Sequence, residues 1–166
     1  MVVGSHSGSR AAGIMLGSVA STLAHEAPVP VLVARRPRPE APFPVRLLVA
    51  SDGSEGSAAA TRLAAGIARR HGSSVVQIHV DAAGGGRRHR MAVEAAELMR
   101  ATGSEPVILS ELGNPQERIV EEARMEPASL VVLGSRGLRG VRALGSVSER
   151  VVHEVPCSVL VARPGR

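Results

Sequence analysis

Residues 129–163 read SLVVLGSRGLRGVRALGSVSERVVHEVPCSVLVAR, and the pattern of this stretch indicates the fold class. Residues 129–133 and 158–162 are short, nearly continuous apolar runs, which is typical of strands buried on both faces of a parallel sheet. Between them a glycine-rich loop leads to Ser146, where a helix is predicted to begin and to continue to Glu154. A strand, a loop at its carboxyl end and a helix returning to a neighbouring strand form the repeating unit of an α/β fold.

The same alternation fills the chain upstream of this stretch. Apolar runs predict strands at residues 45–50, 75–80 and 106–109, and amphipathic patterns predict helices at 58–71, 90–101 and 115–124. Right-handed crossovers then favour a Rossmann-like α/β fold, a doubly wound, open, five-stranded parallel sheet with strand order 3-2-1-4-5. In such sheets ligands bind at the carboxyl ends of the strands where the winding reverses, here after the first and fourth strands.

Part of the opening stretch occurs twice in the chain. Residues 17–35 recur as residues 145–163 at an offset of 128, and residues 3–5 recur as 133–135 at an offset of 130. We therefore expect residues 1–36 to be the truncated C-terminal part of a second unit, too short to fold alone. Residues 37–44 are predicted to be a proline-rich extended linker, and residues 45–164 a complete domain.

Composition excludes several classes of function. The chain has one phenylalanine and no tyrosine or tryptophan, so it lacks the aromatic platforms that stack single-stranded bases, and we expect no specific nucleic-acid partner. The net charge of +5 comes from arginine alone, and the run Arg87-Arg88-His89-Arg90 is expected to be a solvated loop. The single Cys157 excludes an internal disulfide, and no apolar run is long enough for a membrane helix.

Catalytic machinery is not evident in the sequence. The six histidines have no metal-ligand spacing, and we interpret them as surface residues or residues with satisfied hydrogen bonds. No serine, histidine and acid grouping suggests a nucleophile, so we expect no enzymatic turnover beyond a slow ATPase activity.

The loop at residues 134–146 carries the most chemical information. Its glycines permit close backbone approach, and exposed N–H groups before a helix N-terminus make an anion site for which phosphate is the natural guest. A flexible turn is the alternative reading of the same glycines. The usual fingerprints are absent: there is no G-x-G-x-x-G, and a P-loop is impossible without lysine.

These residues resemble the ATP-binding signature of the universal stress protein family, G-x-x-G, nine residues and G-[ST]. Gly134-x-x-Gly137 and Gly145-Ser146 match it, and residues 147–149, 156–161, 48–54 and 113–115 are also similar to that family. The similarity covers residues 45–163.

The resemblance implies a cytoplasmic stress-response protein that binds ATP or another adenine nucleotide, with Mg²⁺ as a companion ion, and binds partners in a nucleotide-dependent way. By position, Asp52 would contact adenosine, Val80 would pack on adenine, and Leu133 with Gly134 would face the ribose. The phosphates would be held by Gly137, Gly145, Ser146 and Val147, and Ala50 and Ser51 complete the implied set. The alternative reading of Asp52 is a turn or helix-cap aspartate.

The family resemblance also implies dimerisation through the last strand, from Val159 to Ala162. Residues Val31 to Ala34 could supply the same edge within this chain, as an intramolecular pseudo-dimer. Two departures from the family pattern keep a second hypothesis open, an interaction module that no longer binds nucleotide. The spacer between Gly137 and Gly145 has seven residues instead of nine, and in the first copy Ser7 replaces the second glycine.

Overall fold

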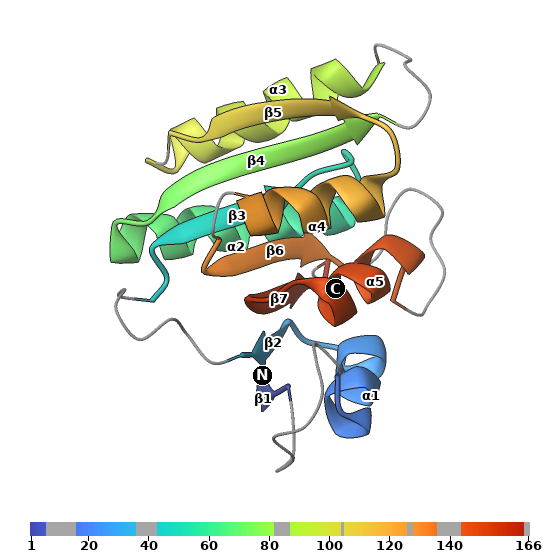
Figure 1. Cartoon of the computed structure of the whole chain (residues 1–166). Helices are drawn as coiled ribbons and strands as arrows, with labels where there is room; N and C mark the ends of the chain where they lie inside the picture. Colours follow the sequence, from blue (N-terminus) through green and yellow to red (C-terminus); the bar gives the residue numbers. More distant parts are fainter. Residues whose placement is uncertain are drawn as a thin grey trace.

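The computed structural model describes residues 1–5, 16–35, 43–81, 87–103, 105–125, 128–135 and 144–164. A single sheet with helices on both faces contains all the described strands (Figure 1). In chain order the elements are β1 (Val2–Gly4), α1 (Ser18–Glu26), β2 (Val31–Ala34), β3 (Arg46–Ala50), α2 (Glu55–His71), β4 (Ser74–Asp81), α3 (Arg87–Ala101), β5 (Val107–Leu112), α4 (Pro115–Met125), β6 (Leu130–Gly134), α5 (Ser146–Glu154) and β7 (Ser158–Ala162).

The sheet is larger than the sequence predicts. It has seven strands in the order β1-β2-β7-β6-β3-β4-β5, so the prediction of a five-stranded, wholly parallel sheet is wrong. The two additional strands come from the repeated N-terminal segment, whose β2 pairs antiparallel with β7, while β1 pairs parallel with β2. The strands from β3 to β7 are parallel to their neighbours, so the sheet is mostly parallel.

Local signals explain where the helices begin and end. Ser54 caps α2, because its side chain accepts a hydrogen bond from the N–H of Ser57, and this cap starts the helix upstream of the predicted residue 58. Gly72 ends α2 in the left-handed conformation, at φ 66°. The arginine run lies at the start of α3, which corrects the prediction of a solvated loop: the helical pattern of residues 90–101 extends back to Arg87.

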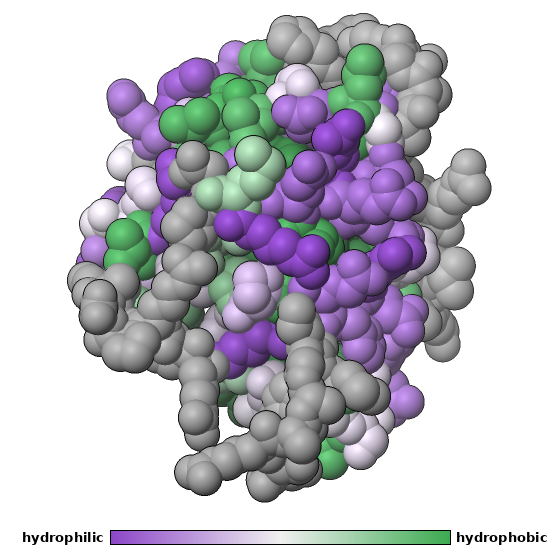
Figure 2. Space-filling model, viewed as in Figure 1, coloured by the Kyte–Doolittle hydropathy of each residue, from purple (hydrophilic) through white to green (hydrophobic). Residues whose placement is uncertain are grey.

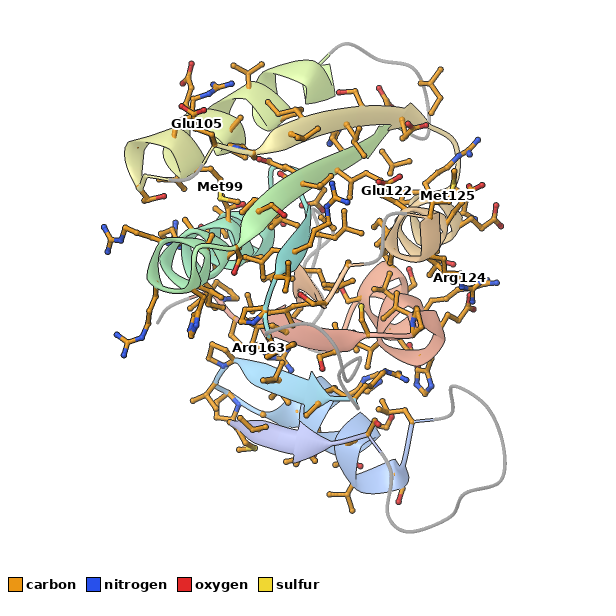
Figure 3. The ribbon with its side chains drawn as sticks, turned by 60° about the vertical axis from the view of Figure 1, so that its left-hand side comes forward. Met99, Glu105, Glu122, Arg124, Met125 and Arg163 are labelled. Carbon is orange, nitrogen blue, oxygen red and sulfur yellow. The ribbon has the colours of Figure 1, made fainter. Side chains whose placement is uncertain are left out.

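Two apolar layers hold the helices to the sheet. Helices α1, α4 and α5 cover one face and share a core cluster that includes Ala24, Ile119 and Val151. Helices α2 and α3 cover the other face, where Ala60 and Met99 belong to the second cluster. Figure 3 shows Met99 beneath α3. On the outside, hydrophilic residues gather over α4 and α5, and hydrophobic ones lie nearer β5 (Figure 2).

The repeated segments meet as two halves of a local pseudo-twofold. Val31 is the register partner of Val161, and Val33 is the register partner of Val159. The repeat offset of 128 residues makes Val31 equivalent to Val159 and Val33 equivalent to Val161, so the two pairs are equivalent to each other.

Two equivalent arginines repeat this reciprocity with side chains. Arg35 Nη2 donates to the carbonyl of Val152 at 2.5 Å, and Arg163 Nη2 donates to the carbonyl of Ala24 at 2.5 Å. Burial lowers the pKa of Arg35, and the nearby Cys157 partly opposes this shift. Figure 3 shows Arg163 between β7 and the N-terminal strands.

No helix in the described part of the chain is both long enough and apolar enough to cross a membrane.

Candidate functional site

The candidate site lies where β3, β4 and β6 end. Val49 is the register partner of Val132, which places the segment after β3 beside the segment after β6. From β3 the chain winds through α2 to β4 on one side, while β6 and β7 extend the sheet on the other. This is the reversal point of a doubly wound sheet, where parallel strands splay their connections apart and leave a crevice.

Asp52 follows β3 and is half-buried. Its Oδ1 accepts a hydrogen bond from the N–H of Ser54 at 3.0 Å, so one carboxylate oxygen closes the turn that leads into α2. The turn reading of Asp52 is therefore correct for that oxygen. No hydrogen bond within the described residues engages Oδ2, which leaves this oxygen to accept from a ligand.

Gly134 ends β6 against the start of α2. A Cβ at this position would lie 2.5 Å from the carbonyl carbon of Gly56 and 2.8 Å from the N of Ser57, both backbone atoms. Only glycine fits this approach, and Ser148 Oγ of α5 donates to the Gly134 carbonyl at 2.6 Å. The end of β6 is thus fixed between the first turns of two helices, and both helix N-termini lie at the site.

The N-terminus of α5 has donors available. Gly145 occupies the N-cap at φ −68° and ψ 153°, and no side chain caps the helix. The N–H of Gly145 itself donates to the carbonyl of Ser135 at 2.8 Å. The N–H groups of Ser146 and Val147 have no intrahelical acceptor because they lie in the first turn, so an anion can bind there.

Two serine hydroxyls at the ends of β3 and β6 lack hydrogen-bond partners within the described residues. Ser51 is 6% exposed and Ser135 is 0% exposed, and neither Oγ is bonded. Buried hydroxyl groups are nearly always paired with protein, water or ligand. Because both hydroxyl groups lie at the carboxyl edge of the sheet, a molecule bound there can supply their hydrogen-bond partners.

The apolar residues predicted for the site lie together on one face. Val80 and Leu133 are buried in the core cluster beneath α4 and α5, and Ala50 and Val147 pack against the same cluster. These four side chains form an apolar wall on the face of the sheet beneath α4 and α5.

The structure thus brings together nine of the ten predicted residues at this edge: Ala50, Ser51, Asp52, Val80, Leu133, Gly134, Gly145, Ser146 and Val147. The tenth, Gly137, lies outside the described residues, as does most of the seven-residue spacer.

Three contributors were not predicted from the sequence: Gly56, Ser135 and His79. Gly56 matters only because Gly134 approaches it, and nothing local to Gly56 signals that contact. Of the two interpretations of the histidines, the surface one is wrong for His79, and the satisfied one holds for one of its ring nitrogens. This residue is 3% exposed; its Nδ1 lies 2.8 Å from the carbonyl oxygen of Ser51, and its Nε2 has no partner among the described residues.

Sequence comparison places the chain among known proteins. Residues 1–35 and 45–163 match the model of the universal stress protein family. A universal stress protein of Thermus aquaticus is 35% identical over 134 residues, covering 70% of this chain and 97% of that relative. One of Mycobacterium tuberculosis is 32% identical over an alignment of 186 residues, covering 98% of this chain and 58% of that relative. The chain therefore spans little more than half the length of the mycobacterial relative.

Solved structures show the same fold. A universal stress protein from Archaeoglobus fulgidus matches 99% of this chain and 60% of its own length, with a TM-score of 0.75 and 28% identity. A universal stress protein in complex with cAMP matches at a TM-score of 0.65 and 27% identity, covering 73% of this chain and 98% of its own. Another from Archaeoglobus fulgidus, in complex with dAMP, matches at 0.60 and 26%, covering 71% and 97%. This chain belongs to the universal stress protein family.

Proposed function

We propose that the chain binds an adenine nucleotide at the carboxyl edge of β3, β4 and β6, and that the bound nucleotide controls the binding of partners. The observation that carries the proposal is the meeting of three unsatisfied features at one edge. These are the second oxygen of Asp52, the buried hydroxyls of Ser51 and Ser135, and the uncapped N-terminus of α5. Relatives of similar fold in complex with cAMP and dAMP support an adenine nucleotide as the ligand.

Each part of a nucleotide has a matching surface. The apolar wall of Val80, Leu133 and Val147 suits the adenine ring, and the carboxylate of Asp52 accepts hydrogen bonds from adenosine. The first turn of α5 presents N–H groups and a positive dipole end to the phosphates. The nucleotide that we propose is ATP, with Mg²⁺ shielding its phosphates. We also propose a cytoplasmic location, where ATP and Mg²⁺ are both present. The short spacer leaves Gly145, Ser146 and Val147 as the main phosphate contacts.

The experiment is to release bound nucleotide from the purified protein. Heat-denatured protein is extracted and the supernatant is resolved by ion-exchange chromatography. We expect adenine nucleotide from the wild type and a loss of at least tenfold from Asp52→Ala and Gly145→Val. A valine at Gly145 brings its side chain to the phosphate-facing end of α5.

The repeat offers a matched control. Gly17 is the N-cap of α1 at φ −66° and ψ 153°, nearly the geometry of Gly145, and its N–H likewise donates to a serine carbonyl, that of Ser5. Residues 1–36 contain no aspartate, so this segment has no counterpart of Asp52. Gly17→Val should therefore keep the nucleotide. Wild-type protein that releases no nucleotide and binds none in solution would contradict the proposal.

A second candidate function is an interaction module, and the pairing of β2 with β7 favours it. The β2 strand occupies the edge of β7 along Val31–Ala34, so a second chain cannot pair there while β2 is in place. We propose that this intramolecular pseudo-dimer replaces a homodimer through β7. Deleting residues 1–36 should convert monomer to dimer in light scattering, with nucleotide affinity unchanged. An unchanged mass after the deletion counts against this candidate.

A further inference from the structure

A line of buried polar atoms crosses the face of the sheet beneath α2 and α3. Gln77 and His79 lie two residues apart on β4 and so face the same side. Gln77 is 0% exposed and neither atom of its amide has a hydrogen-bond partner among the described residues, and the same holds for Nε2 of His79. Buried polar groups are normally paired, so the presence of these polar side chains in the core has to be explained.

For His79, the hydrogen bond of its other ring nitrogen provides an explanation. Nδ1 of His79 lies 2.8 Å from the carbonyl oxygen of Ser51. A carbonyl oxygen only accepts, so Nδ1 must carry the proton, and Nε2 of the neutral ring is then an acceptor. The register of β3 and β4 ends at Ala50 and Ile78, followed by one bond from the N–H of Ser51 to the carbonyl of Ile78 at 3.0 Å. The His79 ring therefore extends the strand pairing beyond the end of β3.

Ser51 is followed directly by the turn that carries Asp52. Asp52 Oδ1 accepts from the N–H of Ser54 at 3.0 Å, and Ser54 in turn caps α2. The His79 ring is thus hydrogen-bonded to the Ser51 carbonyl, whose peptide bond leads directly to Asp52, and the Asp52 carboxylate is in turn hydrogen-bonded to the residue that caps α2. Movement of the Ser51 carbonyl would rotate the peptide that precedes Asp52.

We propose that His79 is a positioning residue of the nucleotide site: by holding the carbonyl of Ser51 it fixes the turn that presents Asp52 to the ligand. This inference rests on the proposed nucleotide-binding function. His79 acts from the α2 and α3 side of the sheet, opposite the apolar wall, and does not itself touch the nucleotide.

Two substitutions at position 79 separate positioning from packing. The side-chain amide of His79→Asn places an N–H near the position of Nδ1, so it keeps the bond to Ser51, whereas His79→Leu fills space without a donor. Losing one hydrogen bond of this kind should weaken nucleotide binding about three- to tenfold in His79→Leu. His79→Asn should bind within about twofold of the wild type.

Gln77 provides the matched control. It is equally buried, lies on the same strand and face, and has no bond to Ser51. Gln77→Leu therefore makes the same polar-to-apolar change without touching the turn, and its nucleotide affinity should equal that of the wild type. Equal losses in Gln77→Leu and His79→Leu would overturn the proposal, because they would indicate a general packing effect.

Two measurements on nucleotide-free protein make the test independent of ligand binding. Nitrogen-15 NMR of the wild type should show His79 protonated on Nδ1 and not on Nε2; the reverse tautomer overturns the proposal. Hydrogen exchange of the Ser54 amide, which is bonded to Asp52, should be faster in His79→Leu and unchanged in His79→Asn and Gln77→Leu.

The two failures are distinguishable. If the wild type binds no nucleotide while the exchange pattern at Ser54 is as expected, the proposed function fails and the role of His79 in fixing the turn stands. If the wild type binds nucleotide and His79→Leu binds it equally well, the positioning role fails.

Discussion

Gly134→Ala tests how the site is assembled, because a single added methyl group would separate β6 from α2. The new Cβ would lie 2.5 Å from the carbonyl carbon of Gly56, 2.8 Å from the carbonyl oxygen of Gly56 and 2.8 Å from the N of Ser57. All three are backbone atoms, so no side chain can rotate away and the first turn of α2 must shift. Overpacking of this kind lowers the free energy of unfolding by about 1–3 kcal/mol, and the rigid neighbours place Gly134 near the upper end.

The assay is urea or thermal unfolding followed by circular dichroism. For a chain of this size about 3 kcal/mol corresponds to a decrease in Tm of roughly 6–12 °C. Gly66→Ala is the matched control. Gly66 lies in α2, the helix that Gly134 approaches, and a Cβ at Gly66 would meet nothing within 4 Å. That substitution should raise the free energy of unfolding by about 0.5–1 kcal/mol, since alanine is the better helix former.

The opposite signs of the two changes make the prediction strict. If Gly134→Ala unfolds within about 0.5 kcal/mol of the wild type, the close approach between β6 and α2 is not present in solution. The end of β6 would then be held by α5 through Ser148 and not by the first turn of α2.

Two further predictions concern contacts at the edges of the site and of the repeat. Ser148→Ala removes the 2.6 Å bond to the Gly134 carbonyl and should lower the free energy of unfolding by about 1 kcal/mol in urea titration, whereas alanine at the exposed Ser146 should change it by less than about 0.5 kcal/mol. Arg163→Ala removes the charge-assisted bonds to the carbonyls of Ala24 and His25, which contribute about 1.5–3 kcal/mol. Hydrogen exchange should become faster in α1 and not in α3; equal acceleration in both helices would show that Arg163 stabilises the whole fold instead.

The regular elements follow from the sequence because their signals are local. Helix α5 (Ser146–Glu154) and strand β7 (Ser158–Ala162) have the predicted bounds. Gly145 precedes the helix as its N-cap residue, and the strand is an apolar run that follows a proline. The number of strands does not follow from such signals. Val2–Gly4 is too short to be recognised as a strand by its own pattern, and it becomes one only because β2 is already held by β7.

The candidate site divides in the same way. The position of Asp52 and Gly134 at the ends of adjacent strands could be predicted, because alternating strands and helices determine which loops meet. The roles of Gly56 and His79 could not. Gly56 is one of 18 glycines and His79 is one of six histidines, and only the tertiary approach of a second backbone segment distinguishes them.

Calorimetric titration of the protein with ATP is the most direct test for a nucleotide site, with Gly145→Val and Gly17→Val measured beside the wild type. We predict saturable binding of one adenine nucleotide per chain, retained in Gly17→Val and lost in Gly145→Val. Absence of binding in the wild type, or equal loss in the two glycine variants, would contradict a nucleotide site at the N-terminus of α5.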